Sequence, residues 1–244
     1  AYGARIGSHC YANVWFELNE VITRTRLRMK LIVEQLSLKD YVPVWQRMVA
    51  FTQTREPDTQ DELWLLQHNP VYTQGRAGKS EHLLAPSPLI PLVQSDRGGQ
   101  ITYHGPGQLI AYTLIDLSRL AMGIKSFVCR LEEILIDTLK HFAISAHRQS
   151  GAPGVFVNGS KIASIGLRCR HNRLYHGIAL NINMDLQPYQ AINPCGFSGL
   201  SITQMADFNE AITVPDVIPT WTSLFSKHLG YQPVIRPTHK ELMS

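Results

Sequence analysis

The chain has 244 residues, of which 44 % are apolar, a formal net charge of +4 and four cysteines. This length and apolar content predict one main domain with a sizeable core. The cysteines are widely spaced and form no C-x-x-C pair, which excludes a disulfide framework and a zinc knuckle and indicates a reducing compartment.

Most of the net charge belongs to residues 1–30, which hold five Lys or Arg against two Glu. The rest of the chain gives no support to a nucleic-acid-binding groove. No apolar run is long enough for a transmembrane helix, and the N-terminus lacks the pattern of a secretory signal. We therefore expect a cytoplasmic protein with no nucleic-acid or membrane partner. Residues 1–30 are expected to form an extension of unknown role, and residues 31–244 a single domain.

The first half of the main domain shows apolar runs separated by turn residues. Residues 31–36 read as a strand, and Asp40 precedes a helix with Val44, Met48 and Phe51 on one face. Residues 62–67 and 71–74 are expected to be strands. Residues 75–91 carry Gly, Pro and Ser and are predicted to form a loop long enough to be functional.

A turn and a long helix follow. Residues 100–103 and 108–116 are expected to be strands on either side of the turn-forming sequence His104-Gly105-Pro106-Gly107. Ser126 is a candidate cap for the next helix, which carries Phe127, Leu131, Leu135, Leu139 and Phe142 on one face.

The strongest hairpin signal of the chain is Asn158-Gly159, because both residues accept the positive φ values of a type I′ turn. It separates residues 155–157 from residues 161–170. The sequence His171-Asn172 predicts a second turn before a strand at residues 174–182. A C-terminal helix is expected at residues 215–229. Strands dominate the middle of this order, which favours an α+β domain with largely antiparallel sheets.

Two residues that could carry chemistry together are Cys195, in Asn193-Pro194-Cys195-Gly196, and Lys161, which lies 34 positions upstream. The chain between them can fold back as a hairpin and bring thiol and amine together. Such a pair shares one proton and supports covalent acyl transfer. The alternatives are a buried, inert Cys195 and a strand-end Lys161 whose ammonium group reaches solvent.

Further candidates surround turns. The glycines of Arg97-Gly98-Gly99 allow close approach to the backbone, either by a ligand or in a tight turn with a solvated arginine. His104 and His176 could orient a substrate or pair with Cys195. The histidines lack metal-binding spacing, and no phosphate-binding loop or dinucleotide fingerprint is present, so we expect no metal and no cofactor.

The motifs taken together resemble those of the lipoyl(octanoyl) transferases, which are related to the catalytic domains of biotin and lipoate protein ligases. The resemblance runs from about Leu31 to the C-terminal helix. It is carried by Arg97-Gly98-Gly99-Gln100-Ile101-Thr102-Tyr103-His104-Gly105-Pro106-Gly107-Gln108, Gly154-Val155, Lys161-Ile162-Ala163-Ser164-Ile165-Gly166-Leu167-Arg168, His176-Gly177-Ile178-Ala179-Leu180-Asn181 and Ile192-Asn193-Pro194-Cys195-Gly196.

This resemblance implies an α/β domain with two packed sheets and an enzyme that moves an octanoyl or lipoyl group from acyl carrier protein to the target lysine of a lipoyl domain. The acceptors implied are the lipoyl domains of 2-oxoacid dehydrogenase complexes and the glycine cleavage H protein. Cys195 would form the acyl thioester, and Lys161 would be its acid and base. The implied substrate-binding residues are Arg97, Gly98, Gly99, Gln100, Ile101, Thr102, Tyr103, His104, Ser164, Ile165, Gly166, Gly177, Ile178 and Ala179.

Three other functions have to be compared with this one. An ATP-dependent lipoate or biotin protein ligase would share the fold and the lysine but needs no acyl-accepting cysteine. A papain-like hydrolase would pair Cys195 with a histidine, yet its order of an early cysteine and a later histidine is absent. An inactive lipoyl-domain binder would not need both Cys195 and Lys161.

Overall fold

The computed structural model describes residues 29–85 and 87–237 of the chain. The predicted N-terminal extension, residues 1–30, lies outside the described residues except for Met29 and Lys30, which begin the first strand. No helix in the described part of the chain is long and apolar enough to cross a membrane.

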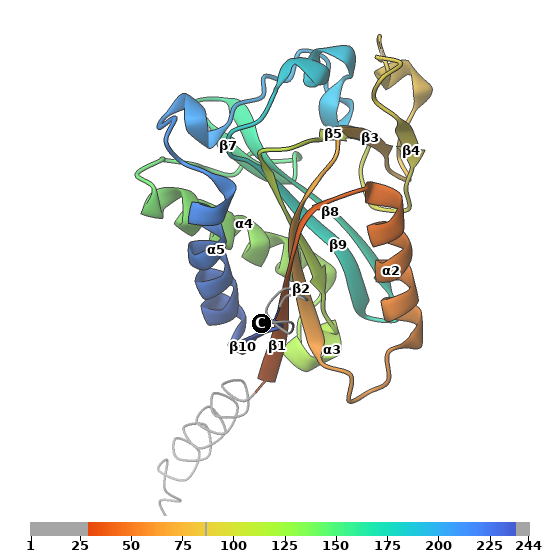
Figure 1. Cartoon of the computed structure of the whole chain (residues 1–244), viewed down its shortest axis with the longest axis vertical. Helices are drawn as coiled ribbons and strands as arrows, with labels where there is room; N and C mark the ends of the chain where they lie inside the picture. The colour runs from red at the N-terminus through yellow and green to blue at the C-terminus, as the bar shows by residue number, and fades with distance from the viewer. Residues whose placement is uncertain (1–28, 86, 238–244) are drawn as a thin grey trace, which may run out of the picture.

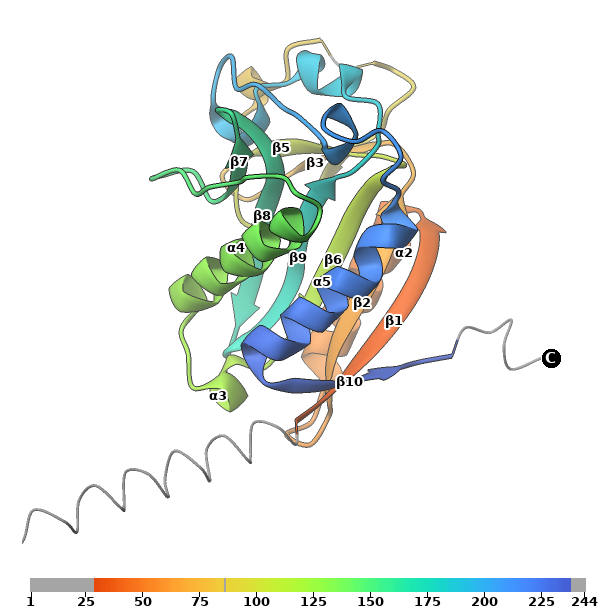
Figure 2. The ribbon, with the colours of Figure 1, turned by 90° about the vertical axis from the view of Figure 1, so that its left-hand side faces the viewer.

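Two sheets form the centre of the described domain, and helices cover both faces of the larger one (Figures 1 and 2). The larger sheet has the order β10-β1-β2-β6-β9-β8-β7, and the smaller has the order β4-β3-β5. The elements are β1 (Met29–Lys39), α2 (Tyr41–Thr54), β2 (Asp61–His68), β3 (Val71–Gln74), η1 (Ser80–His82), β4 (Leu92–Gln94), β5 (Ile101–His104), β6 (Gln108–Leu114), α3 (Leu117–Leu120), α4 (Ile124–His141), β7 (Gly154–Val157), β8 (Ser160–Arg170), β9 (Arg173–Asn181), η2 (Gln187–Ala191), η3 (Pro194–Gly196), η4 (Met205–Asp207), α5 (Val214–Leu229) and β10 (Tyr231–Ile235).

The alternation of side chains along the large sheet separates two apolar cores. One face packs on α4 and α5, with Phe127, Leu131 and Trp221 fully buried. The other face packs on α2, where Met48 contacts the cluster that contains Trp64. A strand with both faces covered is buried almost throughout, as β6 is. The large sheet therefore lies between two apolar layers, one on each face.

Both predicted hairpin turns are confirmed. Asn158 and Gly159 have φ values of 50° and 80°, and His171 and Asn172 have φ values of 48° and 63°. These two turns place β7, β8 and β9 side by side with antiparallel pairing. The position of Lys161 near the start of β8 follows directly from the first of them.

Some expectations need correction. Ser126 does not cap α4, because the helix begins at Ile124 with Gly123 as the N-cap, so Ser126 already lies in the first turn. The predicted loop of residues 75–91 contains a short 3-10 turn at Ser80–His82. The antiparallel expectation does not hold for β1, which pairs in parallel with β2 and β10, or for β3, which pairs in parallel with β4. Sequence patterning did not indicate β4 or β10.

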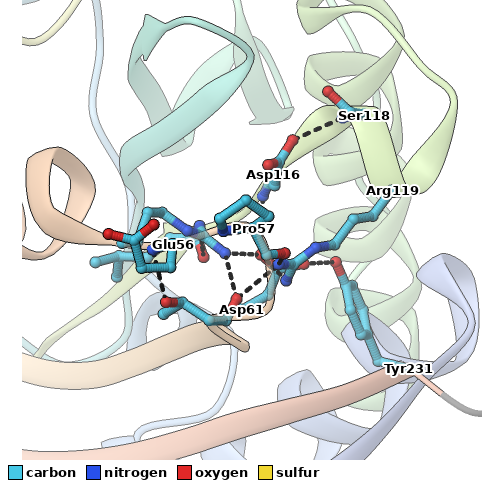
Figure 3. Close-up of polar contacts among 10 residues, drawn as sticks. Glu56, Pro57, Asp61, Asp116, Ser118, Arg119 and Tyr231 are labelled. Atoms are coloured by element: carbon cyan, nitrogen blue, oxygen red, sulfur yellow. Dashed lines mark hydrogen bonds and ion pairs between the residues drawn. The ribbon is translucent and has the colours of Figure 1, made fainter.

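A buried carboxylate holds the parallel edge of β2, β1 and β10 together (Figure 3). Asp61, at the start of β2, is fully buried and accepts hydrogen bonds from the Arg55 guanidinium at 2.6 Å and the Tyr231 hydroxyl at 2.6 Å. Arg119 of α3 lies 3.2 Å away, and the Asp116 backbone N–H donates to the same side chain at 2.9 Å. Because Tyr231 belongs to β10, the contact reaches across β1 and fixes the C-terminal strand.

Replacing Asp61 with alanine is expected to lower the free energy of unfolding by about 3–5 kcal/mol, because it leaves a buried guanidinium without its counter-charge. Urea denaturation measures the change. Asp58→Ala removes an exposed carboxylate three residues away and serves as the control. A loss of under about 1 kcal/mol for Asp61→Ala would show that the ion pair contributes no more than a surface pair.

Candidate active site

The amine of Lys161 and the thiol of Cys195 are in direct contact. Lys161 Nζ donates a hydrogen bond to Cys195 Sγ at 3.1 Å and a second one to the Pro153 carbonyl at 3.0 Å. The lysine is only 2 % exposed, and its amine lies 5.3 Å from the centre of the Phe156 ring. The alternative of an exposed strand-end lysine is therefore wrong. Cys195 is only half-buried and has a polar partner, so it is not the fully buried apolar cysteine of the other alternative.

The backbone on both sides of this pair is fixed by hydrogen bonds. The Lys161 N–H donates to the Ser201 carbonyl at 2.8 Å, and the Lys161 carbonyl accepts from the Thr203 N–H at 3.0 Å. The segment that follows the Cys195 turn is therefore anchored on β8. Before the turn, the Asn193 N–H donates to the His82 carbonyl at 2.8 Å. The thiol is thus held from both flanks of its turn.

Cys195 itself has an uncommon backbone conformation. Its φ is +57°, in the left-handed region, and Gly196 follows with a φ of +79°. A side chain other than glycine in this region costs on the order of 1 kcal/mol. Pro194 fixes the approach to the turn. The sequence Asn193-Pro194-Cys195-Gly196 therefore folds as the predicted turn, but with the strain placed on the cysteine.

Beside the pair lies a cavity of about 410 Å³, and most of the side chains around it are apolar or small. It is lined by thirteen of the predicted substrate-binding residues, namely Arg97, Gly98, Gly99, Gln100, Ile101, Thr102, His104, Ser164, Ile165, Gly166, Gly177, Ile178 and Ala179, together with Lys161 and Cys195. Tyr103 is the exception. Its side chain packs against the rings of Tyr72 and Tyr189, with centroid distances of 5.6 Å, and lies in the core cluster of the small sheet.

Small residues on two neighbouring strands leave room for this cavity. Gly166 of β8 lies opposite Gly177 of β9, and Ser164 lies opposite Ala179. On the far side of β9, Gly177 pairs with Tyr112 of β6, whose side chain also lines the cavity. The cavity thus crosses β9 and β8, from the large side chains of β6 towards Lys161.

The Arg97-Gly98-Gly99 segment covers one side of the cavity. The Gly98 N–H donates to the Leu167 carbonyl at 2.9 Å, and a Cβ on Gly98 would lie 3.1 Å from that oxygen. A side chain at this position would press on β8, so glycine suits the close approach of the two segments. Arg97 is only 8 % exposed and donates hydrogen bonds to the Thr73 hydroxyl, the Thr73 carbonyl and the Gly98 carbonyl. The alternative of a solvated arginine in a tight turn is therefore wrong.

This guanidinium forms no ion pair among the described residues, and burial lowers its pKa from the ordinary arginine value. A buried positive charge without a carboxylate partner is costly. It favours negative charge that develops in the neighbouring cavity.

Neither candidate histidine forms a hydrogen bond to the Cys195 thiol among the described residues. His104 contacts Gln108 Oε1 at 2.8 Å and the Thr73 hydroxyl at 3.3 Å. Burial, reinforced by the nearby His68 and Arg97, lowers the pKa of His104 to about 3, so the imidazole is neutral at physiological pH. The cavity wall at this position carries no charge. His104 is therefore not the partner of Cys195.

His176 is held by Asp96, whose Oδ1 lies 2.9 Å from His176 Nε2. Burial raises the pKa of Asp96, but hydrogen bonds from His176, Tyr175 and Trp45 outweigh it and hold the pKa well below the usual range. Burial is also the largest cause of the lowered pKa of His176. This network lies beside the cavity. His176 forms no hydrogen bond to Cys195 among the described residues, and its buried Nδ1 has no hydrogen-bond partner there.

Several lining residues escaped sequence reasoning. Tyr41 reaches the cavity from the start of α2, while Ile124 and Val128 come from the first turns of α4. No local pattern marks them, because each belongs to an element brought in by tertiary packing. Phe197 is different, because it follows Cys195 by two residues and is 48 % exposed. A large apolar residue beside a turn could have indicated a cavity-lining position. The described residues contain no group of three or more side chains placed to hold a metal ion.

Comparison with known proteins agrees with this geometry. The family model described as "Lipoyl protein ligase A/B catalytic domain" matches residues 40–226. The octanoyltransferase of Legionella pneumophila (strain Corby) is 55 % identical over 195 residues, covering 80 % of this chain and 98 % of the relative. The octanoyltransferase of Hahella chejuensis is 50 % identical over 216 residues, covering 88 % of this chain and 96 % of the relative.

Among solved structures, a bi-partite lipoate protein ligase from Thermoplasma acidophilum superposes with a TM-score of 0.68 at 17 % identity, covering 88 % of this chain and 90 % of that chain. This likeness confirms the predicted fold class. The two curated relatives are matched over nearly their whole length, and both carry the same name. The chain belongs to the lipoyl protein ligase A/B catalytic-domain family and, within it, to the octanoyltransferases, which are acyltransferases.

Proposed function

We propose that the enzyme takes an octanoyl group from acyl carrier protein onto Cys195 as a thioester and then transfers it to the target lysine of a lipoyl domain. The observation that carries this proposal is the 3.1 Å contact between Lys161 Nζ and Cys195 Sγ at the wall of a largely apolar cavity. A nucleophile in contact with a base is the arrangement that covalent acyl transfer requires.

The first step exchanges one thioester for another. Lys161 accepts the proton of the Cys195 thiol, and the sulfur attacks the carbonyl carbon of the octanoyl group on the carrier. The bond from that carbon to the carrier sulfur breaks, and the carrier thiol leaves with the proton that Lys161 returns. The bond formed and the bond broken are of the same kind, so the step needs no ATP.

The second step forms an amide. The amine of the acceptor lysine attacks the Cys195 thioester, Lys161 removes a proton from the attacking nitrogen, and the cysteine sulfur leaves as a thiol. An amide is more stable than a thioester, which makes this step favourable. Both protein substrates react at the same sulfur, so the carrier has to leave before the lipoyl domain arrives. Ping-pong kinetics follow from this order.

The cavity is suited to an alkyl chain. Its lining includes Ile110, Ile165, Ile178 and Val128, and the neutral His104 adds no charge to the wall. Each methylene group withdrawn from water contributes about 0.8 kcal/mol to binding. We propose that the octanoyl chain occupies the space over β8 and β9, and that the thirteen predicted substrate-binding residues around it are its contacts. The buried Arg97 would favour the oxyanion that develops during each acyl transfer.

The acceptors proposed are the lipoyl domains of 2-oxoacid dehydrogenase complexes and the glycine cleavage H protein, as in the family that the chain belongs to. An ATP-dependent ligase is the competing function, and the cysteine separates the two. A ligase activates a free acid with ATP and has no use for a thiol that holds the acyl group. Cys195 in contact with a buried lysine favours the transferase.

The deciding experiment supplies the enzyme and an apo lipoyl domain with either octanoyl carrier protein alone or free octanoate with ATP. Mass spectrometry of the domain is expected to find modification in the first reaction. Cys195→Ala should abolish both the transfer and a hydroxylamine-sensitive adduct on the enzyme. Cys129→Ala and Cys169→Ala change the other free cysteines of the described residues and should retain both. Modification only with octanoate and ATP would establish a ligase instead.

The role of Lys161 as a base predicts that arginine cannot replace it. Arginine keeps the positive charge but does not release its proton at accessible pH. Lys161→Arg should therefore lower the transfer rate by roughly 100-fold or more, nearly as much as Lys161→Ala. Steady-state kinetics and the rate of Cys195 alkylation against pH measure the two effects. Wild-type transfer by Lys161→Arg would contradict the assignment of the base.

A further inference from the structure

The second hydrogen bond of the Lys161 amine leads away from the cavity. Its acceptor is the Pro153 carbonyl, at 3.0 Å, in an irregular and exposed segment that leads into β7. The position of the Lys161 amine therefore depends on how firmly this exposed segment is held, and in particular on the peptide unit between Pro153 and Gly154.

That peptide unit is bound on its other side by Glu132. The Gly154 N–H donates to Glu132 Oε1 at 3.1 Å. The N–H of Gly154 and the carbonyl of Pro153 belong to one peptide bond, which is trans, since the described chain contains no cis peptide. The two groups therefore point in opposite directions, one to the carboxylate and one to the lysine. A single rigid plane connects Glu132 to Lys161 Nζ and, through it, to Cys195 Sγ.

The same carboxylate also holds the other end of the segment. Glu132 Oε2 forms an ion pair with Arg148 Nε at 3.1 Å. Arg148 in turn donates to the Cys129 carbonyl at 2.6 Å and pairs with Glu133 at 3.1 Å. Residues 148–154 are thus tied to α4 at both ends. Glu132 is only 8 % exposed, which keeps water from competing for these contacts.

The stem of the Lys161 side chain lies against Gly154. Gly154 has a φ of +125°, and a Cβ there would lie 2.3 Å from the Ala163 carbonyl and 3.0 Å from Lys161 Cε. The lysine side chain therefore passes directly over this residue. A rotation of the Pro153–Gly154 peptide would move the carbonyl away from Nζ and press the backbone against the stem.

We propose that Glu132 is a positioning residue that orients the amine of Lys161 towards Cys195 through the Pro153–Gly154 peptide unit. The inference rests on the proposed function of Lys161 and Cys195. A carboxylate that accepts the N–H also polarises the peptide and strengthens its carbonyl as an acceptor for the lysine. For this role Glu132 needs an acceptor oxygen close enough to the Gly154 N–H, which a side chain of glutamate length provides. Arg148 balances its charge.

Three substitutions of Glu132 test separately the length of its side chain, its negative charge and its volume. Glu132→Gln keeps an acceptor oxygen at the same reach and loses the charge. Glu132→Asp keeps the charge and the attraction to Arg148 but withdraws the oxygen from the Gly154 N–H. Glu132→Met keeps a similar volume without an acceptor. Glu133→Gln, on the neighbouring and half-exposed side chain, removes a charge that pairs with Arg148 but no contact to the Pro153–Gly154 peptide, and is the control.

The expected result is that Glu132→Gln and Glu133→Gln retain most of the wild-type kcat, while Glu132→Asp and Glu132→Met lose roughly 10- to 100-fold, because a misplacement of about 1 Å costs that much. KM for octanoyl carrier protein should change little. The pH profile of Cys195 alkylation should move in Glu132→Asp and Glu132→Met and stay in place in the other two. Thermal melting identifies any variant that does not fold, and Glu132→Asp then tests the proposal without Glu132→Met.

A double-mutant cycle decides whether the effect passes through the lysine. In a Lys161→Ala background, Glu132→Asp and Glu132→Gln should alkylate Cys195 at the same rate. A difference of the same size as in the wild-type background would show that Glu132 acts independently of Lys161 and would overturn the inference. So would wild-type kcat and pH profile in Glu132→Asp. A wild-type enzyme without any acyl adduct on Cys195 would instead overturn the proposed function.

Discussion

A lysine amine that is almost completely withdrawn from water has to find its hydrogen-bond partners inside the protein. Lys161 has two, the sulfur of Cys195 and one backbone carbonyl, and neither is a carboxylate that would hold a permanent ion pair. In the proposed function, this arrangement lets the amine exchange a proton with the sulfur. The hairpin that carries Lys161, the anchored turn of Cys195 and the segment bound to α4 all preserve this one contact.

The parts of the fold that sequence reasoning predicted well are those written in short, local patterns. Asn158-Gly159 and His171-Asn172 adopt the positive φ values that their residue types favour, and they determine the order of β7, β8 and β9. The proximity of Lys161 and Cys195 follows from that fold-back. Motif resemblance supplied the cavity residues, since spacing alone does not show that Gly166 and Gly177 lie opposite each other.

The parts that it missed depend on contacts between distant segments. The parallel strand β10 is mostly exposed, so no apolar alternation marks it, and its position is set by the bond from Tyr231 to Asp61. Tyr103 lies in a motif that lines the cavity, yet its ring packs in the core cluster of the small sheet, against Tyr72 and Tyr189. Tyr41 reaches the cavity only because α2 crosses the sheet, and no neighbour in the sequence indicates that.

At Cys195, whose backbone is left-handed, the stability of the fold and the presence of a thiol favour different residues. Glycine would relax this turn, and measured by folding free energy alone it is the better residue for position 195. A procedure that searches a chain for stabilising substitutions from backbone conformation would therefore replace this cysteine with glycine and remove the thiol. In the proposed function, the cysteine at this position is kept for its reactivity, which outweighs the conformational preference of the turn.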